Sequence, residues 1–295
     1  MRSFKVWAAS AATAAALVVG GASSANAELV WGITFDNNLF SFDSASPGNI
    51  LTGVYVSGLQ SNEFIQGIDF RPATGELYAL GSTNRVYKLD TATGAATAVG
   101  GPFTPALNGV AYGVDFNPTV DRIRVHSSSN QNLRLNPVTG AVAATDPNLY
   151  YAAGDPGAGL DPNIVATAYS NNFAGATTTQ LFSIDSARDV LVRHQLGAGD
   201  PAGSFAEMIT VGPLGVPFGD YSGFDISPSG AAFVHWNNAN ALFGTINLAT
   251  GAVTSVGSIG GGLFVRDIAV VIPEPASAGM LGLAAVGLLV RARRK

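Results

Sequence analysis

The sequence predicts an all-β fold, a β-propeller of about five four-stranded blades, closed by pairing of its N- and C-terminal strands. Three observations predict it. A short motif recurs along residues 28–272, and each copy is followed by further short strands that end in turn signals. In addition, no stretch of this region has the periodicity of a long amphipathic helix.

The recurring motif is first seen at Gly67–Pro72, which reads Gly-Ile-Asp-Phe-Arg-Pro. It returns at Gly113–Pro118 and at Gly223–Pro228, and Val265–Ile268 is a weaker copy. Ala166–Asn171 stands at the remaining expected place and lacks the acidic residue. Four copies of the motif therefore have an aspartate at the same position, and these residues are Asp69, Asp115, Asp225 and Asp267.

Each copy leads into three more short strands. After Gly67–Pro72 these are Leu77–Leu80, Val86–Asp90 and Ala95–Val99, and Thr93-Gly94 supplies a hairpin turn between the last two. Asp or Asn favours the start of such a turn, and Gly adopts the positive φ that the turn needs. Four short strands in a unit of roughly 45 to 55 residues are typical of a propeller blade.

The first unit lacks an opening strand, because it contains only Leu29–Thr34, Leu39–Phe42 and Ile50–Val56. A single unpaired strand, Leu263–Val271, comes last. Pairing it with the first unit closes the ring and leaves no free sheet edge, which gives five blades. A β-sandwich or a more irregular propeller is the alternative architecture.

Composition excludes several classes of site and partner. The chain has no cysteine, which rules out disulfides, thiolate zinc sites and a cysteine nucleophile. Residues 28–272 contain nine Lys or Arg against nineteen Asp or Glu, a balance of −10. Binding to nucleic acid needs clustered cations, so no nucleic-acid partner is expected.

The N-terminus is typical of a secretory signal peptide. Arg2 and Lys5 precede the apolar stretch 6–20, and Ala25-Asn26-Ala27 is a small-x-small cleavage site. We expect residues 1–27 to be removed and the mature chain to begin at Glu28, with the Sec translocon and signal peptidase as partners. An N-terminal anchor helix is the alternative.

The C-terminal segment 273–295 has three parts. Pro273-Glu274-Pro275 comes first, followed by the apolar run 276–290, which would span about 22 Å as a helix. A basic cluster ends the chain: Arg291, Arg293, Arg294 and Lys295. The basic cluster favours the cytoplasmic side, which places the body, residues 28–272, outside.

This tripartite ending resembles the PEP-CTERM sorting signal of bacteria that make exopolysaccharide. The resemblance implies that an exosortase, a membrane cysteine protease, recognises Pro273-Glu274-Pro275 and processes the tail. The protein would then be anchored transiently in the inner membrane before it reaches the cell surface or the exterior. The alternative is an ordinary C-terminal anchor in which the Pro-Glu-Pro is incidental.

The body resembles an uncharacterised bacterial family, a domain of unknown function that often occurs in PEP-CTERM proteins. The matching stretches are Gly67–Gly75, Asp115–Val125 and Asn132–Pro137. The resemblance implies no known activity and no catalytic residues.

Candidate chemistry is sparse. His126, His194 and His235 have no helical metal-ligand spacing, so satisfied or solvent-facing side chains are the favoured interpretation. If the repeated aspartates lie on the innermost strands, they could ring the channel and bind Ca²⁺; the favoured alternative is that each accepts hydrogen bonds from backbone amides. No other cofactor is expected. Arg122, Arg124 and Arg134 could hold an acidic polysaccharide, although pairing with nearby aspartates is favoured.

Three functions remain open. The first is a surface or matrix protein with a non-catalytic propeller, linked to exopolysaccharide or biofilm. The second is a carbohydrate- or Ca²⁺-binding propeller, and the third is an extracellular polysaccharide hydrolase or lyase. The first is favoured, because the sorting tail is specific and no catalytic motif such as G-x-S-x-G is present.

Overall fold

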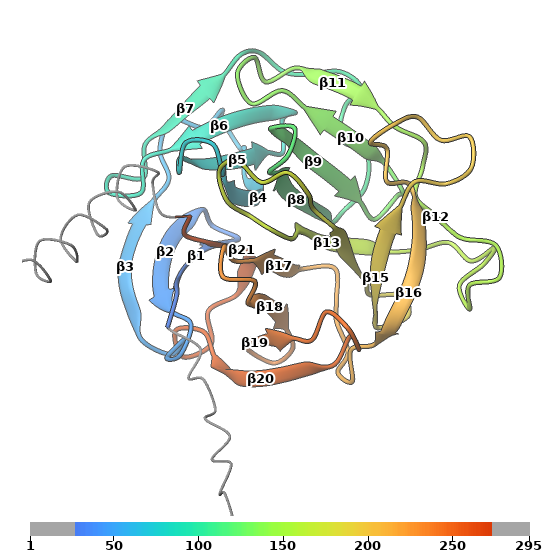
Figure 1. The fold of residues 1–295 in the computed structure, drawn as a ribbon. Coiled ribbons are helices and arrows are strands. Elements are labelled where there is room, and N and C mark those ends of the chain that lie inside the picture. Colours follow the sequence, from blue (N-terminus) through green and yellow to red (C-terminus); the bar gives the residue numbers. More distant parts are fainter. Residues whose placement is uncertain (1–26, 273–295) are drawn as a thin grey trace, which may run out of the picture.

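A computed structural model describes residues 27–272, so the predicted sorting motif, the C-terminal apolar helix and all but the last residue of the predicted signal peptide lie outside the described residues. Within this range, five sheets, each with four antiparallel strands, are arranged in a ring around a common axis (Figure 1). The predicted five-bladed β-propeller is confirmed.

Each blade is ordered from the axis outward. Blade 1 contains β21 (Val265–Val270), β1 (Leu29–Thr34), β2 (Asn38–Asp43) and β3 (Ile50–Tyr55). Blade 2 contains β4 (Ile65–Phe70), β5 (Leu77–Gly81), β6 (Arg85–Leu89) and β7 (Ala96–Val99). Blade 3 contains β8 (Tyr112–Asn117), β9 (Arg122–Ser127), β10 (Asn132–Leu135) and β11 (Val142–Thr145).

The last two blades follow the same plan. Blade 4 contains β13 (Ile164–Tyr169), β14 (Leu181–Asp185), β15 (Val190–Gln195) and β16 (Glu207–Pro213). Blade 5 contains β17 (Ser222–Ile226), β18 (Ala232–Asn237), β19 (Ala241–Ile246) and β20 (Val253–Ser258).

The ring is closed by the pairing that the strand count predicts. β21 is the innermost strand of blade 1, where Val270 pairs with Val30, and the Val271 N–H donates to the Leu29 carbonyl at 3.0 Å. The inner strands β4, β8, β13, β17 and β21 pack against one another around the axis (Figure 1). The two ends of the described chain therefore leave the propeller side by side.

Blade 4 departs from the predicted four strands. A two-residue strand, β12 (Tyr150–Tyr151), pairs in parallel with β16 at the outer edge. The Tyr151 hydroxyl donates to the Asp185 carboxylate, and its ring packs with Leu149 and Met208. This added strand buries part of the long segment between blades 3 and 4, which the repeat pattern does not describe.

Packing occurs mainly between blades rather than within them. One apolar cluster joins blades 4 and 5, where Phe218 stacks on Trp236 with ring centroids 5.4 Å apart. Another joins blades 5 and 1, where Phe42 meets Phe243 edge to face at 5.0 Å. Both faces of the inner strands are thus covered by neighbouring blades, which explains why these strands are buried along nearly their whole length.

The outer hairpins have the predicted turn chemistry. Gly94, Gly140 and Gly251 have φ values of 73°, 70° and 81°, a region that favours glycine. At the first of these turns, Asp90 Oδ1 accepts the backbone N–H groups of Ala92 and Thr93 at 2.9 Å. The turns close each blade at its outer edge.

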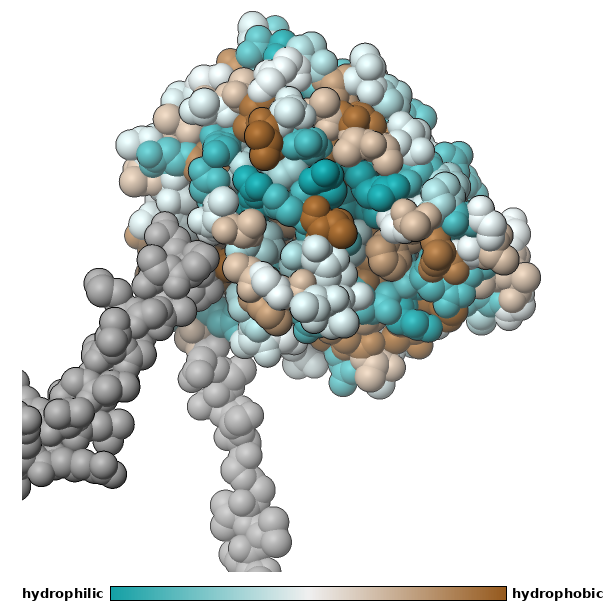
Figure 2. All heavy atoms as spheres, turned by 45° about the horizontal axis from the view of Figure 1, so that its top comes forward, coloured by the Kyte–Doolittle hydropathy of each residue, from teal (hydrophilic) through white to brown (hydrophobic). Residues whose placement is uncertain are grey.

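On the face shown in Figure 2, hydrophilic residues form a broad area, and hydrophobic residues are scattered among them. Within residues 27–272, no helix is long and apolar enough to cross a membrane.

Candidate functional site at the propeller axis

The repeated aspartates lie where the innermost strands meet. Asp69 is on β4, Asp115 on β8, Asp225 on β17 and Asp267 on β21, and all four side chains are buried. One carboxylate oxygen from each of Asp69, Asp115 and Asp225 lies within 4.8 Å of the other two. We call these three residues the axial cluster.

Strand register shows that only three of the five inner strands have an aspartate at the repeated position. Asp69, Asp115 and Asp225 face Tyr78, Arg124 and Phe233 on the second strands of their blades. The corresponding residues of blades 4 and 1 are alanines, which are Ala168 opposite Phe182 and Ala269 opposite Trp31.

The predicted alignment of Asp267 with the other aspartates is therefore wrong by two residues. Asp267 occupies the place that glycine takes in the full copies of the motif, and it accepts the N–H groups of Ile68 and Ile268. The register shift in the pairing of β1 with β21, around Arg266, does not account for this, because the pairings of β4 with β5 and of β13 with β14 shift at the equivalent place. The weak motif copy at Val265–Ile268 is too short to reveal this two-residue offset from the sequence alone.

The axial cluster satisfies one backbone amide from every blade. Asp69 accepts the N–H groups of Phe70 (2.7 Å) and Phe116 (2.6 Å). Asp225 accepts those of Ile226 and Val270, both at 2.6 Å. Asp115 accepts that of Tyr169 at 3.0 Å. The aspartates thus accept amide hydrogen bonds, some from their own strand and some from a neighbouring blade.

Burial dominates the electrostatics of these carboxylates. It raises the pKa of Asp69 and Asp115 well above the usual value, and the charges of the neighbouring aspartates raise both further. Burial raises the pKa of Asp225 to about 6, although two backbone N–H groups favour its charged form. The axis is therefore a place where negative charge is costly unless a proton or a cation accompanies it.

The three histidines are buried, so the solvent-facing alternative is wrong for all of them. His126 and His194 come from neighbouring blades, and their ring centroids are 4.8 Å apart. Ser183 Oγ lies 2.7 Å from His194 Nε2, and His194 Nδ1 lies 2.8 Å from the Phe205 carbonyl.

This serine–histidine pair was not predicted, because the two residues are joined only by the pairing of β14 with β15. Its geometry is that of an activated hydroxyl, since a histidine nitrogen stands within hydrogen-bond distance of the serine oxygen. Both side chains are closed off from solvent, however. A substrate has no access to the serine in this conformation.

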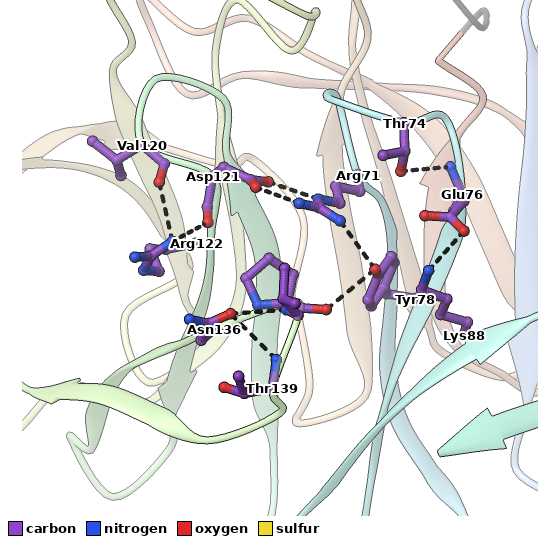
Figure 3. A network of polar contacts seen from close by, with 12 residues as sticks. Arg71, Thr74, Glu76, Tyr78, Lys88, Val120, Asp121, Arg122, Asn136 and Thr139 are labelled. Atoms are coloured by element: carbon purple, nitrogen blue, oxygen red, sulfur yellow. Dashed lines mark hydrogen bonds and ion pairs between the residues drawn. The ribbon is translucent and has the colours of Figure 1, made fainter. Parts of the chain in front are cut away.

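The three arginines of blade 3 have different surroundings. Arg124 is 1% exposed and donates to Asp146, and Arg134 donates to both oxygens of the same carboxylate. The favoured pairing with aspartate is confirmed for these two. Within the part of the chain that the structure describes, Arg122 donates only to backbone carbonyls, those of Val120 and Asp121 (Figure 3).

A groove of about 470 Å³ lies beside the turn between β8 and β9 of blade 3. Its lining includes Arg122, Arg134, Thr119 and Phe205. Next to it, Arg71 donates to Asp121 and to the Tyr78 hydroxyl, and that hydroxyl donates to the Pro137 carbonyl (Figure 3). This network ties the turns of blades 2 and 3 together beside the groove.

Comparison with known proteins gives a family and no activity. The family described as a domain of unknown function, DUF4394, matches residues 38–269. No curated protein matches the chain.

Solved structures with a similar fold are distant. A protein of unknown function from Bacteroides caccae is 10% identical, with a TM-score of 0.44, over 83% of this chain and 98% of that one. A protein of unknown function from Bacteroides thetaiotaomicron VPI-5482 is 17% identical, with a TM-score of 0.46, over 84% and 65%. The Dos1 propeller is 15% identical, with a TM-score of 0.40, over 77% and 57%.

Proposed function

Because the chain belongs to the DUF4394 family, whose description assigns no function, we propose its role from its two ends and its surface. It is an exported, non-catalytic propeller that acts as an interaction module at the cell surface or in the extracellular matrix. A signal peptidase removes residues 1–27, and an exosortase-type enzyme processes the PEP-CTERM segment, residues 273–295. Between the two steps the C-terminal segment anchors the protein transiently in the inner membrane.

The position of the closed ring between the two processing sites carries this proposal. β1 begins at Leu29, directly after Glu28, and β21 ends at Val270, before Pro273. Cleavage at either site therefore leaves every strand of the propeller in place. The Glu28 carboxylate also accepts the hydroxyl groups of Ser227 and Ser229 in blade 5, so the new N-terminus would be held against the ring.

The sorting step is tested by replacing Pro273, Glu274 and Pro275 with alanine in a host that has an exosortase. The variant is expected to stay in the membrane fraction with its tail intact, because the extended Pro-Glu-Pro segment is what the protease would recognise. Ser277→Ala is the matched control and should be processed like the wild type. Normal processing and release of the triple variant would contradict the sorting function.

The groove of blade 3 supports an acidic polysaccharide as the partner. Arg122 forms no ion pair among the described residues, and it shares the groove with the Thr119 hydroxyl and the Phe205 ring. A guanidinium suits a carboxylate of a uronic acid, and an aromatic ring offers a face for a sugar. The proposal therefore links the module to exopolysaccharide and biofilm through this groove.

Binding of a uronic-acid polysaccharide to the purified protein tests this partner. Arg122→Gln should weaken binding about 5- to 30-fold, the effect expected from loss of one charge-assisted hydrogen bond. Arg85→Gln removes an equal charge from β6, away from the groove residues, and should bind like the wild type. Equal binding by all three proteins, or none by the wild type, would argue against the groove as the polysaccharide site.

A further inference from the structure

The axial cluster has one more carboxylate oxygen than the backbone can satisfy. Its three aspartates have six oxygens, and five of them accept the amides of Phe70, Phe116, Tyr169, Ile226 and Val270. The sixth, Asp115 Oδ2, is buried and has no hydrogen-bond partner among the described residues. A buried oxygen without a partner is rare in proteins and points to a bound group.

A second, uncharged side chain points to the same place. Asn172 lies in the segment that follows β13, in the blade whose inner strand has Ala168 instead of aspartate. It is fully buried, its Nδ2 lies 3.5 Å from Asp225 Oδ1, and its Oδ1 has no partner. Rotation of the amide by 180° exchanges the two atoms, so the free oxygen can face the carboxylates.

No cationic side chain balances the cluster within residues 27–272. The four salt bridges of that region join Arg71 to Asp121, Lys88 to Glu76, and both Arg124 and Arg134 to Asp146. None of them reaches Asp69, Asp115 or Asp225. Three buried carboxylates are thus left with backbone amides and the Asn172 amide as their only partners among the described residues, although burial of an unpaired charge is strongly unfavourable.

We propose that the propeller axis binds one Ca²⁺ ion between Asp69, Asp115 and Asp225, with the Asn172 amide oxygen as a further ligand. All four ligands are oxygens, which is the donor set that Ca²⁺ prefers. Two oxygens on one Ca²⁺ can be up to about 5 Å apart, against about 4 Å on Mg²⁺. The oxygens of the cluster lie within 4.8 Å of one another, so all three can share one Ca²⁺. The ion would join β4, β8 and β17, so its role is to lock the ring.

The test is thermal unfolding of the purified full-length protein, first treated with EDTA and then titrated with Ca²⁺ or Mg²⁺. At a hundredfold excess of free Ca²⁺ over its Kd, the Tm should rise by about 5 to 10 °C. Mg²⁺ should give a smaller shift, and elemental analysis should find about one Ca²⁺ per chain.

Variants separate this site from a general effect of calcium. Asp115→Asn and Asn172→Leu should each abolish or strongly reduce the Ca²⁺-dependent shift. Asp267→Asn removes a buried carboxylate from the same ring that lies outside the axial cluster, and it should keep the shift even if its Tm without metal is lower. A wild-type protein without bound Ca²⁺ and with the same Tm in EDTA and in Ca²⁺ would overturn the proposal, as would a full shift in Asp115→Asn.

Discussion

At the scale of single residues, the buried histidines give the molecule its clearest pH dependence. His194 lies between Ser183 Oγ and the Phe205 carbonyl, and burial lowers its pKa to about 3. Burial likewise lowers the pKa of His235 to about 3. In the unfolded chain both would titrate near the ordinary value of about 6.5. Each histidine is therefore neutral in the folded protein while its unfolded form binds a proton below that pH.

The sign of the effect follows from proton linkage. Stability from these two residues is fully present above pH 6.5 and is lost as the pH falls toward 3. We expect His194→Gln to reduce the slope of the unfolding free energy between pH 6 and 4 by about 1.4 kcal/mol per pH unit. The measurement is denaturant unfolding at several pH values.

His235→Gln should reduce the pH slope of the unfolding free energy by the same amount. The double variant, with both substitutions, should reduce it by twice as much. The buried aspartates titrate in every one of these proteins, so the comparison cancels their contribution. A slope that is unchanged in all three variants would show that the histidines are not held neutral.

At the scale of elements, close contact between inner strands explains the glycine of the repeated motif. A Cβ on Gly113 would lie 2.6 Å from the backbone N of Thr167 on β13. One on Gly67 would lie 2.6 Å from Val114 Cγ2 on β8. At these two positions β4 and β8 can thus approach the neighbouring inner strand this closely only because the side chain is a hydrogen. The same approach brings Asp69 to the Phe116 amide and Asp115 to the Tyr169 amide.

Gly113→Ala should accordingly destabilise the propeller by about 1 to 3 kcal/mol, because the added methyl group meets backbone that cannot move alone. Gly101→Ala is the control, since a Cβ there would contact nothing within 4 Å. Urea denaturation of both variants measures the difference. A Gly113→Ala protein as stable as the Gly101→Ala protein would mean that the inner strands are not packed this tightly.

At the scale of the whole molecule, the sequence was sufficient for the fold and insufficient for the site. The Gly-x-Asp motif and the Thr-Gly turns are local signals, and the missing strand of the first unit predicted the closure through β21. By contrast, the place of Asp267 depends on the pairing of β1 with β21, and Asn172 reaches Asp225 from another blade. Contacts between distant segments leave no periodic trace in a single sequence.

The architecture also fits the proposed removal of both ends, which would leave every strand of the propeller in place. Val271 is hydrogen-bonded to Leu29, so the two exits from the ring lie together. β1 begins after Glu28, and β21 ends before Pro273. The proposed processing of the ends would therefore leave the closure of the ring intact. A propeller released in this way would carry its axis and its blade 3 groove unchanged.

The intact mass of the protein recovered from outside the cells tests this account most directly. A processed propeller predicts a chain that begins at Glu28 and has lost the apolar segment 276–290 together with the basic cluster that follows it. A chain that still begins at Met1, or that is recovered outside the cell with Lys295 in place, would contradict it.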